Sequence, residues 1–478
     1  MKAILIYLYL IIAAYLAYLG WYREPLPYLD RDQSCWFSIG FIFVNYLLLV
    51  GVAKMNIISF PSIYYMMSTA FLAVLFPLYL LLGEDMFLVW FIDDVGYFEE
   101  SVVLILLGFC SLFLGILLFP MRKQRPKSSA PLKGVKSTRL TGYFFVLLAF
   151  GIIGLDTLQG GGLALMFKGG YSDFYFSTIN NNRLLGASFV WFIPWGSIFL
   201  VASSNTKRDF RNALFFVLPA MAIVLLVGDR GTLVQMFLAI VLFMSIRGWL
   251  DFRRLIKVRN VIGLFMLLFL LQAVRTTRQV PIQNWTLATF IESDESSEHS
   301  FLVNAFLETS ISIQSIGGTL RIVPQKESYR YGYDYVKPFI NAIPFGGLLF
   351  GFNFSKKTSG ITPSPTAWFT FHYNKYSDVG YGYLQLMEAY LQFDSLGILF
   401  VFGFFGFFLH FLWYKLSTAS QIDSRQMSII LIFITTMFLA IRNDSGGLVR
   451  VVVFNSIILY LITPWIVAVF NQLVKKKP

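Results

Sequence analysis

The chain has 478 residues, of which 57% are hydrophobic and only 13% are charged, and its mean hydropathy is +0.66. A soluble globular chain is nearer to about 45–50% apolar and about 25% charged, so this composition excludes a soluble enzyme, a disordered chain and a fibrous protein and predicts a polytopic membrane protein. In such a protein the formal charge of +12 first concerns the sidedness of the loops and does not indicate nucleic acid as a partner.

Apolar runs that are long enough to cross a membrane recur along the chain. A helix needs about 20 apolar residues to cross roughly 30 Å of hydrocarbon. The first run follows only Lys2 and has no small-residue cleavage site, so we expect it to be retained. Asp229 and Arg230 separate two of the runs, because Gly228-Asp229-Arg230-Gly231 is a turn sequence whose charges are costly at mid-membrane. We predict about twelve spans, at 2–20, 35–53, 62–82, 101–120, 140–157, 186–203, 212–228, 232–246, 260–275, 394–414, 427–441 and 448–470.

The loops between these runs alternate between basic and acidic. By the positive-inside rule the basic set is cytoplasmic, and both termini then face the cytoplasm, as an even number of spans requires. The acids on that side are only Asp209, Asp251 and Asp423. The basic set comprises Lys2, Lys54, the segment 121–139, the loops 204–211, 247–259 and 415–426, and the C-terminal lysines.

One long segment lies on the other, outer side. The predicted organisation is spans one to nine in residues 1–275, a large loop region on the outer side at 276–393, and spans ten to twelve in 394–478. Residues 330–383 are rich in Tyr, Gly and Pro, which is typical of loops and short helices. A loop of this length is usually functional. The expected fold is therefore an all-α polytopic integral membrane protein with a large outer loop of short helices.

Several kinds of chemistry leave no trace in the sequence. It contains neither a G-x-x-x-x-G-K-[ST] motif nor a G-x-G-x-x-G motif that follows a strand, and the cytoplasmic loops are too short for an ATPase domain. His299, His372 and His410 have no metal-ligand spacing, and Cys35 and Cys110 lie in apolar runs. The sequence predicts neither a metal nor a cofactor.

Arginine on the outer side is the most informative feature. The positive-inside rule disfavours it there, yet several arginines lie where predicted helices end at the outer surface. A guanidinium is a planar, permanently charged fork suited to phosphate oxygens, and Arg230 also precedes a helix N-terminus, which favours anions. The alternative is that each arginine snorkels to headgroups or pairs with an acid such as Asp229. As a group we interpret them as a site for a pyrophosphate or another polyanion: Arg230, Arg275, Arg278, Arg442 and Arg450.

A second polar cluster precedes the tenth predicted span. Glu388 lies close to a membrane-embedded helix, where a carboxylate is expensive and tends to be functional. His372 lies nearby in sequence, and Tyr381 and Tyr383 contribute aromatic faces that can stack on sugars or lie at a lipid interface. The alternatives are a structural ion pair for Glu388 and an ordinary loop histidine for His372.

At this point the sequence resembles the Wzy-type O-antigen polymerases, which polymerise oligosaccharide repeat units. The turn at Gly228–Gly231 resembles a G-S-R-G turn shared by O-antigen polymerases and ligases, and Arg442-Asn443-Asp444 resembles the family's late R-x-D/E position. The stretch from Gly380 to Gly397 resembles "G-x-G-[YF]…E-A-Y-L-x-F-G-x-x-G", with Asp394 where the family often has Gly. Arg321 and Gly332, with ten residues between them, fit an R-x10-G pattern. The resemblance covers about residues 140–470.

The resemblance implies a GT-C-like glycosyltransferase that works without a metal in the bacterial inner membrane. It implies undecaprenyl-pyrophosphate-linked oligosaccharides as donor and acceptor, joined at the periplasmic face, in contact with membrane lipid and with a chain-length-regulating co-polymerase as a further partner. Either Glu388, which we prefer, or His372 would accept the proton of the acceptor hydroxyl. Arg230, Arg442 and one of Arg275 or Arg278 would hold the donor pyrophosphate, and the remaining substrate-binding candidates are Arg321, Arg450, Tyr381 and Tyr383.

Two other functions stay open at this stage. An O-antigen ligase would use the same arginine chemistry, although Glu388-Ala389-Tyr390 favours the polymerase. A flippase or other transporter usually has repeated halves and charges at mid-membrane, whereas here the polar residues gather on one side.

Overall fold

The computed structural model describes two compact units that interleave along the chain. Unit 1 comprises Met1–Arg125, Leu302–Lys415 and Met437–Val453, and unit 2 comprises Pro126–Phe301, Leu416–Thr436 and Phe454–Pro478. The sequential division expected from the sequence therefore stays a prediction. The described residues are 2–83, 96–119, 131–161, 163–174, 186–227, 229–250, 282–284, 311–342, 364–373, 382–419, 421–443, 446, 449 and 459–475.

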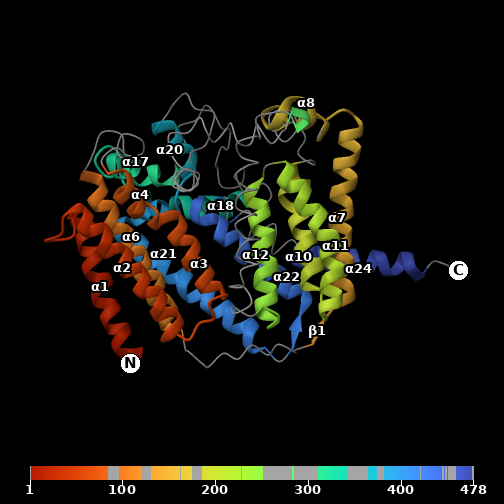
Figure 1. Cartoon of the computed structure of the whole chain (residues 1–478), viewed down its shortest axis with the longest axis horizontal. Helices are drawn as coiled ribbons and strands as arrows, with labels where there is room; N and C mark the ends of the chain where they lie inside the picture. Colours follow the sequence, from red (N-terminus) through yellow and green to blue (C-terminus); the bar gives the residue numbers. More distant parts are fainter. Residues whose placement is uncertain are drawn as a thin grey trace. The chain divides into compact units, whose positions relative to one another are not determined.

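Most of the described chain is helical (Figure 1). Unit 1 contains α1 (Lys2–Tyr22), α2 (Arg31–Gly51), α3 (Phe60–Ser68), η1 (Thr69–Ala73), α4 (Leu75–Leu82), α6 (Gly96–Leu118), η5 (Ile311–Ile313), α17 (Gln314–Ile322), α18 (Tyr333–Ala342), α20 (Pro365–Tyr373), most of α21 (Gln385–Thr418) and η6 (Ala440–Arg442). Unit 2 contains β1 (Leu132–Lys133), α7 (Val135–Leu158), α8 (Leu163–Phe174), η3 (Ser188–Phe192), α10 (Ile193–Ala202), α11 (Lys207–Leu226), α12 (Arg230–Ile246), η4 (Ile282–Asn284), β2 (Ile422–Asp423), most of α22 (Ser424–Leu439) and α24 (Leu459–Lys475).

The helices match most of the predicted membrane spans. Within the described residues, eight helical segments are long and apolar enough to cross a membrane, and α10 and α12 are shorter apolar helices. The ninth predicted span, 260–275, lies outside the described residues, and the twelfth is described only at residue 449 and from residue 459. The chain is thus an α-helical multi-pass membrane protein, while the count of twelve and the side of each loop stay predictions.

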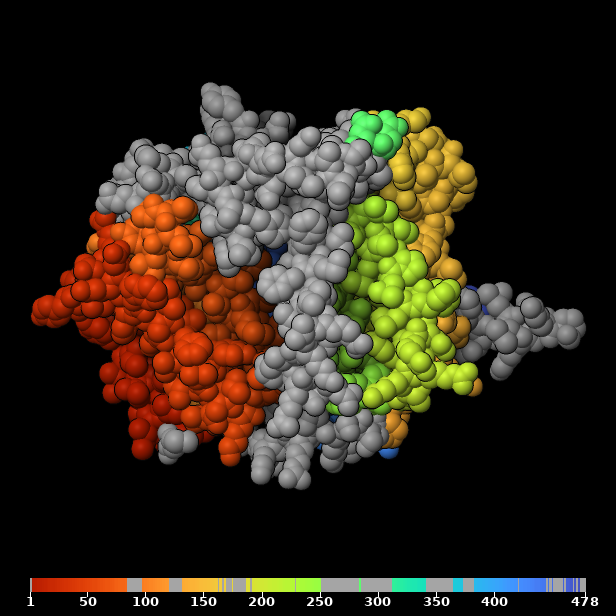
Figure 2. Space-filling view, in the orientation of Figure 1, coloured from red at the N-terminus to blue at the C-terminus, as the bar shows by residue number. Residues whose placement is uncertain are grey.

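In unit 1 the helices pack around α6. Helices α1 and α2 both contact α6, and almost all of the apolar stretch of α6 is buried. A Cβ on Gly115 would lie 1.9 Å from Gly403 O, so α6 and α21 cross where only small residues permit so close an approach. The outer surfaces of α1 and α2 (red in Figure 2) expose large apolar side chains such as Tyr7 and Phe43, as expected of a lipid-facing surface.

In unit 2, segments predicted to be cytoplasmic meet at one end of the helices. Leu132 N donates to Asn205 Oδ1 at 3.0 Å, and Arg247 Nη2 donates to Asn205 O at 2.9 Å. Ser424 Oγ donates to Lys133 O at 2.8 Å. These contacts bring together residues of the predicted loops 121–139, 204–211, 247–259 and 415–426, whose assignment to the cytoplasmic side stays a prediction.

The same region holds a small departure from the predicted all-α fold. Strands β1 and β2 pair in parallel, with Leu132 opposite Ile422 and Lys133 opposite Asp423. The sheet has only two residues in each strand, and it fixes the end of the basic 121–139 segment to the start of α22.

Helix α21 is interrupted where the tenth span was predicted to begin. Phe393 (φ −147°, ψ 28°) and Asp394 (φ 59°, ψ −153°) separate a short helix, residues 385–392, from a long apolar helix that begins at Ser395. The φ and ψ angles of Asp394 are ones that only glycine adopts easily. The resembled family often has glycine at this position, which is consistent with those angles. The Asp394 carboxylate accepts hydrogen bonds from Ser395 N at 2.5 Å and from Tyr329 OH at 2.6 Å.

This conformation leads to a prediction about Asp394. Asp394→Ala keeps the unfavourable backbone and loses both hydrogen bonds, whereas Asp394→Gly loses the hydrogen bonds but relieves the backbone. We expect the glycine variant to unfold at a higher temperature than the alanine variant, with a free-energy difference of about 1–3 kcal/mol. Unfolding of both purified variants in detergent checks this, and an alanine variant as stable as the glycine variant contradicts it.

Candidate functional site

Two motifs that are distant in sequence meet beside Arg442. Tyr383 N donates to Arg442 O at 3.2 Å, and Arg442 Nε donates to Ser312 Oγ at 2.8 Å. Gly382 has φ +75°, and a Cβ there would lie 3.1 Å from Ser312 Oγ and 3.5 Å from Arg442 Nε. Glycine suits both this φ and this narrow space. The Gly382-Tyr383 stretch and the late arginine therefore form one polar group, and the Arg442 guanidinium is half-buried within it.

The short helix 385–392 begins directly after this group and carries Glu388. The Glu388 side chain is buried, with 0% exposure. Burial raises the pKa of the Tyr335 phenol far above its usual value, and the nearby Glu388 and Asp334 carboxylates raise it further. Glu388 thus belongs to a buried polar cluster and does not face solvent.

An ion pair covers the C-terminal end of the short helix. Arg330 Nη1 lies 2.9 Å from Asp334 Oδ2, and the two side chains are only 6% and 2% exposed. Gln392 Nε2 donates to the same Asp334 oxygen at 2.7 Å, and the Arg330 guanidinium lies 5.0 Å from the Trp368 ring. The backbone of the same residue also contacts the short helix, because Arg330 N donates to Leu391 O at 3.0 Å. This pair fixes the segment before α18 to the short helix.

A histidine and a carboxylate form a more accessible pair on the same unit. His372 Nε2 lies 2.9 Å from Glu327 Oε1, and Trp368 Nε1 donates to Glu327 Oε2 at 2.8 Å. The His372 side chain is 31% exposed, and its ring lies 5.2 Å from the Trp368 ring. A carboxylate that holds one ring nitrogen leaves the other ring nitrogen to exchange a proton.

Arg230 lies in unit 2 at the N-terminus of α12. Asp229 is the N-cap: its side chain accepts hydrogen bonds from Thr232 N at 3.1 Å and from Thr232 Oγ1 at 2.6 Å. Gln235, one turn further along α12, donates to Thr436 Oγ1 of α22 at 3.0 Å. Within the predicted Gly228–Gly231 turn, Asp229 caps a helix that begins at Arg230, and Gly228 lies outside the described residues. The expected convergence of Arg230 with Arg442, which belongs to unit 1, stays a prediction.

The other predicted substrate residues have different positions. Tyr383 is fully buried, and its hydroxyl lies 2.9 Å from Thr319 Oγ1, so in this structure it contributes to packing. Arg321, in the last turn of α17, is exposed. Arg275, Arg278, Arg450 and Tyr381 lie outside the described residues.

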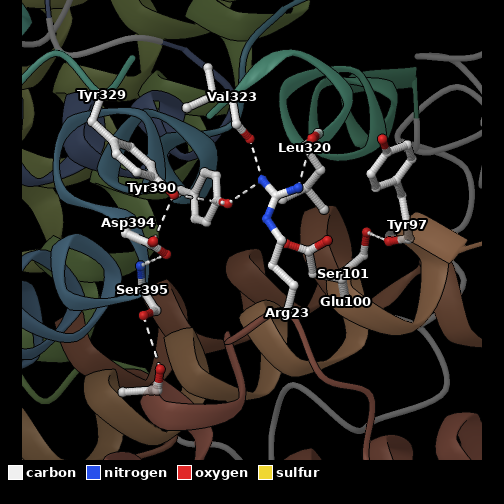
Figure 3. Close-up of polar contacts among 11 residues, drawn as sticks. Arg23, Tyr97, Glu100, Ser101, Leu320, Val323, Tyr329, Tyr390, Asp394 and Ser395 are labelled. Carbon is white, nitrogen blue, oxygen red and sulfur yellow. Dashed lines mark hydrogen bonds and ion pairs between the residues drawn. The ribbon is translucent and has the colours of Figure 1, made fainter. Parts of the chain in front are cut away.

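Sequence reasoning missed three charged residues of unit 1. Arg330 and Glu327 lie within the aromatic outer segment, but only the tyrosines around them were considered. Arg23 follows the first span, and Figure 3 shows it among side chains and carbonyls of the outer segment. The criterion applied to the later spans, an arginine at the outer end of a helix, identifies Arg23 as well.

The described residues contain no group of three His, Cys, Asp or Glu side chains arranged to hold a metal ion. The metal-free site inferred from the sequence stays a prediction.

The chain has apolar helices that are long enough to span a membrane, and its polar groups gather at the N-terminal end of α21. These features define a multi-pass membrane protein with a polar site. The chain belongs to the O-antigen polysaccharide polymerase Wzy family, which matches residues 3–477, and the resemblance seen in the sequence is thereby confirmed. It is therefore a membrane enzyme of O-antigen repeat-unit polymerisation that acts on lipid-linked units. No curated protein and no solved structure matches the chain.

Proposed function

We propose that this enzyme joins undecaprenyl-pyrophosphate-linked repeat units at the periplasmic face of the bacterial inner membrane, without a metal. The observation that carries the proposal is the meeting of Arg442 with the Gly382-Tyr383 stretch at the start of the helix that bears Glu388. This group gathers an arginine, hydroxyls and backbone turns on a segment that the charge alternation assigns to the outer side.

The arginines act on the leaving group in this proposal. When the bond between the sugar and the lipid pyrophosphate breaks, negative charge grows on the phosphate oxygens. A guanidinium placed there stabilises the developing charge without a metal. Arg442 and Arg230 carry this role, with Arg275 or Arg278 as the third cation, and Arg321 and Arg450 are further contacts.

The proposal also includes the topology and a partner. Both termini lie in the cytoplasm, and a chain-length-regulating co-polymerase is a further partner.

For the acceptor proton, accessibility supports His372 over Glu388. Glu388 is 0% exposed, whereas the His372 side chain is 31% exposed and is oriented by Glu327. A general base must lie within hydrogen-bond reach of the hydroxyl that it deprotonates. We therefore propose His372 as the base and Glu388 as a residue that positions the short helix, which reverses the preference drawn from the sequence.

Two variants distinguish these roles. We expect His372→Asn to lower the rate of chain extension by about 10²–10⁴-fold, because it removes the proton acceptor and leaves the fold unchanged. We expect Glu388→Gln, which has the same shape without the charge, to lower the rate by less than about tenfold. Rates per folded molecule of the purified variants measure this, and the opposite order assigns the proton to Glu388.

Reconstitution tests the function itself. Purified enzyme in vesicles that contain the lipid-linked repeat unit should produce a ladder of longer lipid-linked chains, and the ladder should persist in EDTA. A flippase would move the unit across the bilayer and form no new glycosidic bond. A ligase would form no ladder but would transfer preformed polymer to a lipid A core acceptor. Absence of the ladder from folded wild-type enzyme overturns the proposal.

A further inference from the structure

Arg23 has an unusual backbone conformation at the outer end of α1. It is left-handed, with φ 58°, in a position directly after the helix where glycine is the usual residue. Arg23 N donates to Gly20 O at 3.2 Å, and Glu24 N donates to Leu19 O at 2.9 Å, which closes the helix end. A residue other than glycine that keeps this conformation indicates that its side chain contributes something that glycine cannot supply.

The guanidinium of Arg23 joins four acceptors on three segments (Figure 3). Its Nε lies 3.3 Å from Glu100 Oε1 on α6, and its Nη2 donates to Tyr390 OH at 2.9 Å on the short helix. The remaining donors reach the carbonyl oxygens of Leu320, at 3.4 Å, and Val323. Burial alone would lower the pKa of Arg23, but Tyr390 and Glu100 raise it, so the guanidinium stays charged.

The network continues to the break in α21. Tyr329 OH lies 3.4 Å from Tyr390 OH and donates to Asp394 Oδ2 at 2.6 Å. Asp394 is the second residue of the network with a left-handed φ, 59°, and Ser395 Oγ, next to it, donates to Ala17 O of α1 at 3.0 Å. Two positions that favour glycine therefore carry charged side chains, one at each end of the same buried network.

We propose that Arg23 is a positioning residue for polymerisation, an inference that rests on the proposed function. By joining α1 and α6 to the end of α17 and to the short helix, Arg23 sets where the helix with Glu388 lies, and hence where Gly382 and Arg442 lie at its start. An arginine suits this task because its rigid fork reaches several acceptors at once, whereas a lysine is a point charge.

The test compares Arg23→Gln with Arg31→Gln in the purified full-length enzyme. Arg31 is a matched control: it is the first residue of α2, at the other end of the connection that begins with Arg23, and its Nε lies 3.2 Å from Glu99 Oε1. We expect Arg23→Gln to lower kcat for extension by about 10²-fold with KM for the lipid-linked unit changed by less than about threefold, because displaced catalytic groups slow the reaction. Arg31→Gln should stay within about twofold of wild type, since its ion pair with Glu99 is only half-buried and pairs near the surface contribute little. Arg23→Lys should fall between the two.

A second variant separates positioning from stability. Arg23→Gln leaves the Glu100 carboxylate buried without its cation, and adding Glu100→Gln removes that charge. We expect the double variant to recover the wild-type unfolding temperature while its kcat remains low. Backbone hydrogen exchange should rise in residues 385–392 and 320–323 of both variants and remain unchanged in α12.

The outcomes are distinguishable. If wild-type enzyme forms no ladder, the proposed function fails, whatever Arg23 does. If wild type is active and kcat of the double variant recovers together with its unfolding temperature, Arg23 is merely structural and the inference is overturned. Activity of Arg23→Gln equal to that of Arg31→Gln overturns it as well.

Discussion

Arg442→Ala should abolish long polysaccharide and leave single-unit product. Its guanidinium donates to Ser312 and lies beside Gly382, half-buried at the start of the short helix. If it stabilises charge on the departing pyrophosphate, its loss removes an interaction that is strongest in the transition state. Removal of one such donor lowers kcat by about 10²–10³-fold. The polysaccharide ladder in a complemented deletion strain and the initial rate with purified enzyme both measure the effect.

Two further variants make this result specific. Arg442→Lys keeps the charge without the planar fork, so we expect it to retain part of the activity. Asn443→Ala is the matched control, because Asn443 is the exposed next residue and its side-chain amide donates to Leu439 O, at 3.0 Å. Full-length polymer from a folded Arg442→Ala enzyme would remove Arg442 from the mechanism.

A double variant tests whether Arg230 and Arg442 act on one pyrophosphate. They belong to different compact units, and the sequence assigns both to the outer side. Groups that act as a unit are not additive, so Arg230→Ala with Arg442→Ala should be hardly slower than the slower single variant. If the fold-losses in rate of the two single variants multiply in the double variant, the two arginines act at separate sites.

The sequence predicts the helices well because the bilayer imposes a length and an apolar composition on each span. The helix start at Asp229 and Arg230 was located from a local feature, a turn sequence. The break at Phe393 and Asp394 was not predicted: the sequence showed only that Asp394 departs from a glycine position of the resembled family. The two-stranded sheet was not predicted, because Leu132 and Ile422 pair across a long stretch of chain and each strand has only two residues. No periodicity of apolar residues marks so short an element.

The site was predicted in part. The outer arginines were selected because the positive-inside rule disfavours them on that side, and Glu388 was selected because a carboxylate near a membrane-embedded helix is expensive. This reasoning selected Arg442 as a candidate, and the roles of these residues stay predictions. It could not show that Glu388 is buried while His372 is exposed, because exposure depends on how α18 and α20 pack on the short helix. Nor could it pair His372 with Glu327, since the two lie on separate segments that fold together only in the tertiary structure.

Arg330→Ala should destabilise the enzyme more than any other single change considered above. Arg330 and Asp334 form a buried pair at 2.9 Å, so the variant leaves a carboxylate buried without its cation. Breaking such a pair typically costs about 3–5 kcal/mol, whereas replacing both partners with apolar residues of similar volume is often neutral or better. We therefore expect little folded protein from Arg330→Ala and largely recovered folding from Arg330→Met with Asp334→Leu, which still loses the acceptor of Gln392 Nε2. Yield and unfolding temperature in detergent measure both.

The size of this effect follows from burial, and an exposed pair provides the comparison. Arg139 Nη2 lies 3.1 Å from Asp209 Oδ1, but these side chains are 36% and 27% exposed, so Arg139→Gln should change stability by less than about 1 kcal/mol. If the Arg330–Asp334 pair only fixes the segment before α18 to the short helix, the apolar double variant should also recover chain extension, because Arg330 N still donates to Leu391 O. A double variant that folds but extends no chains would instead give the Arg330 guanidinium, which lies 5.0 Å from the Trp368 ring, a direct role in the reaction.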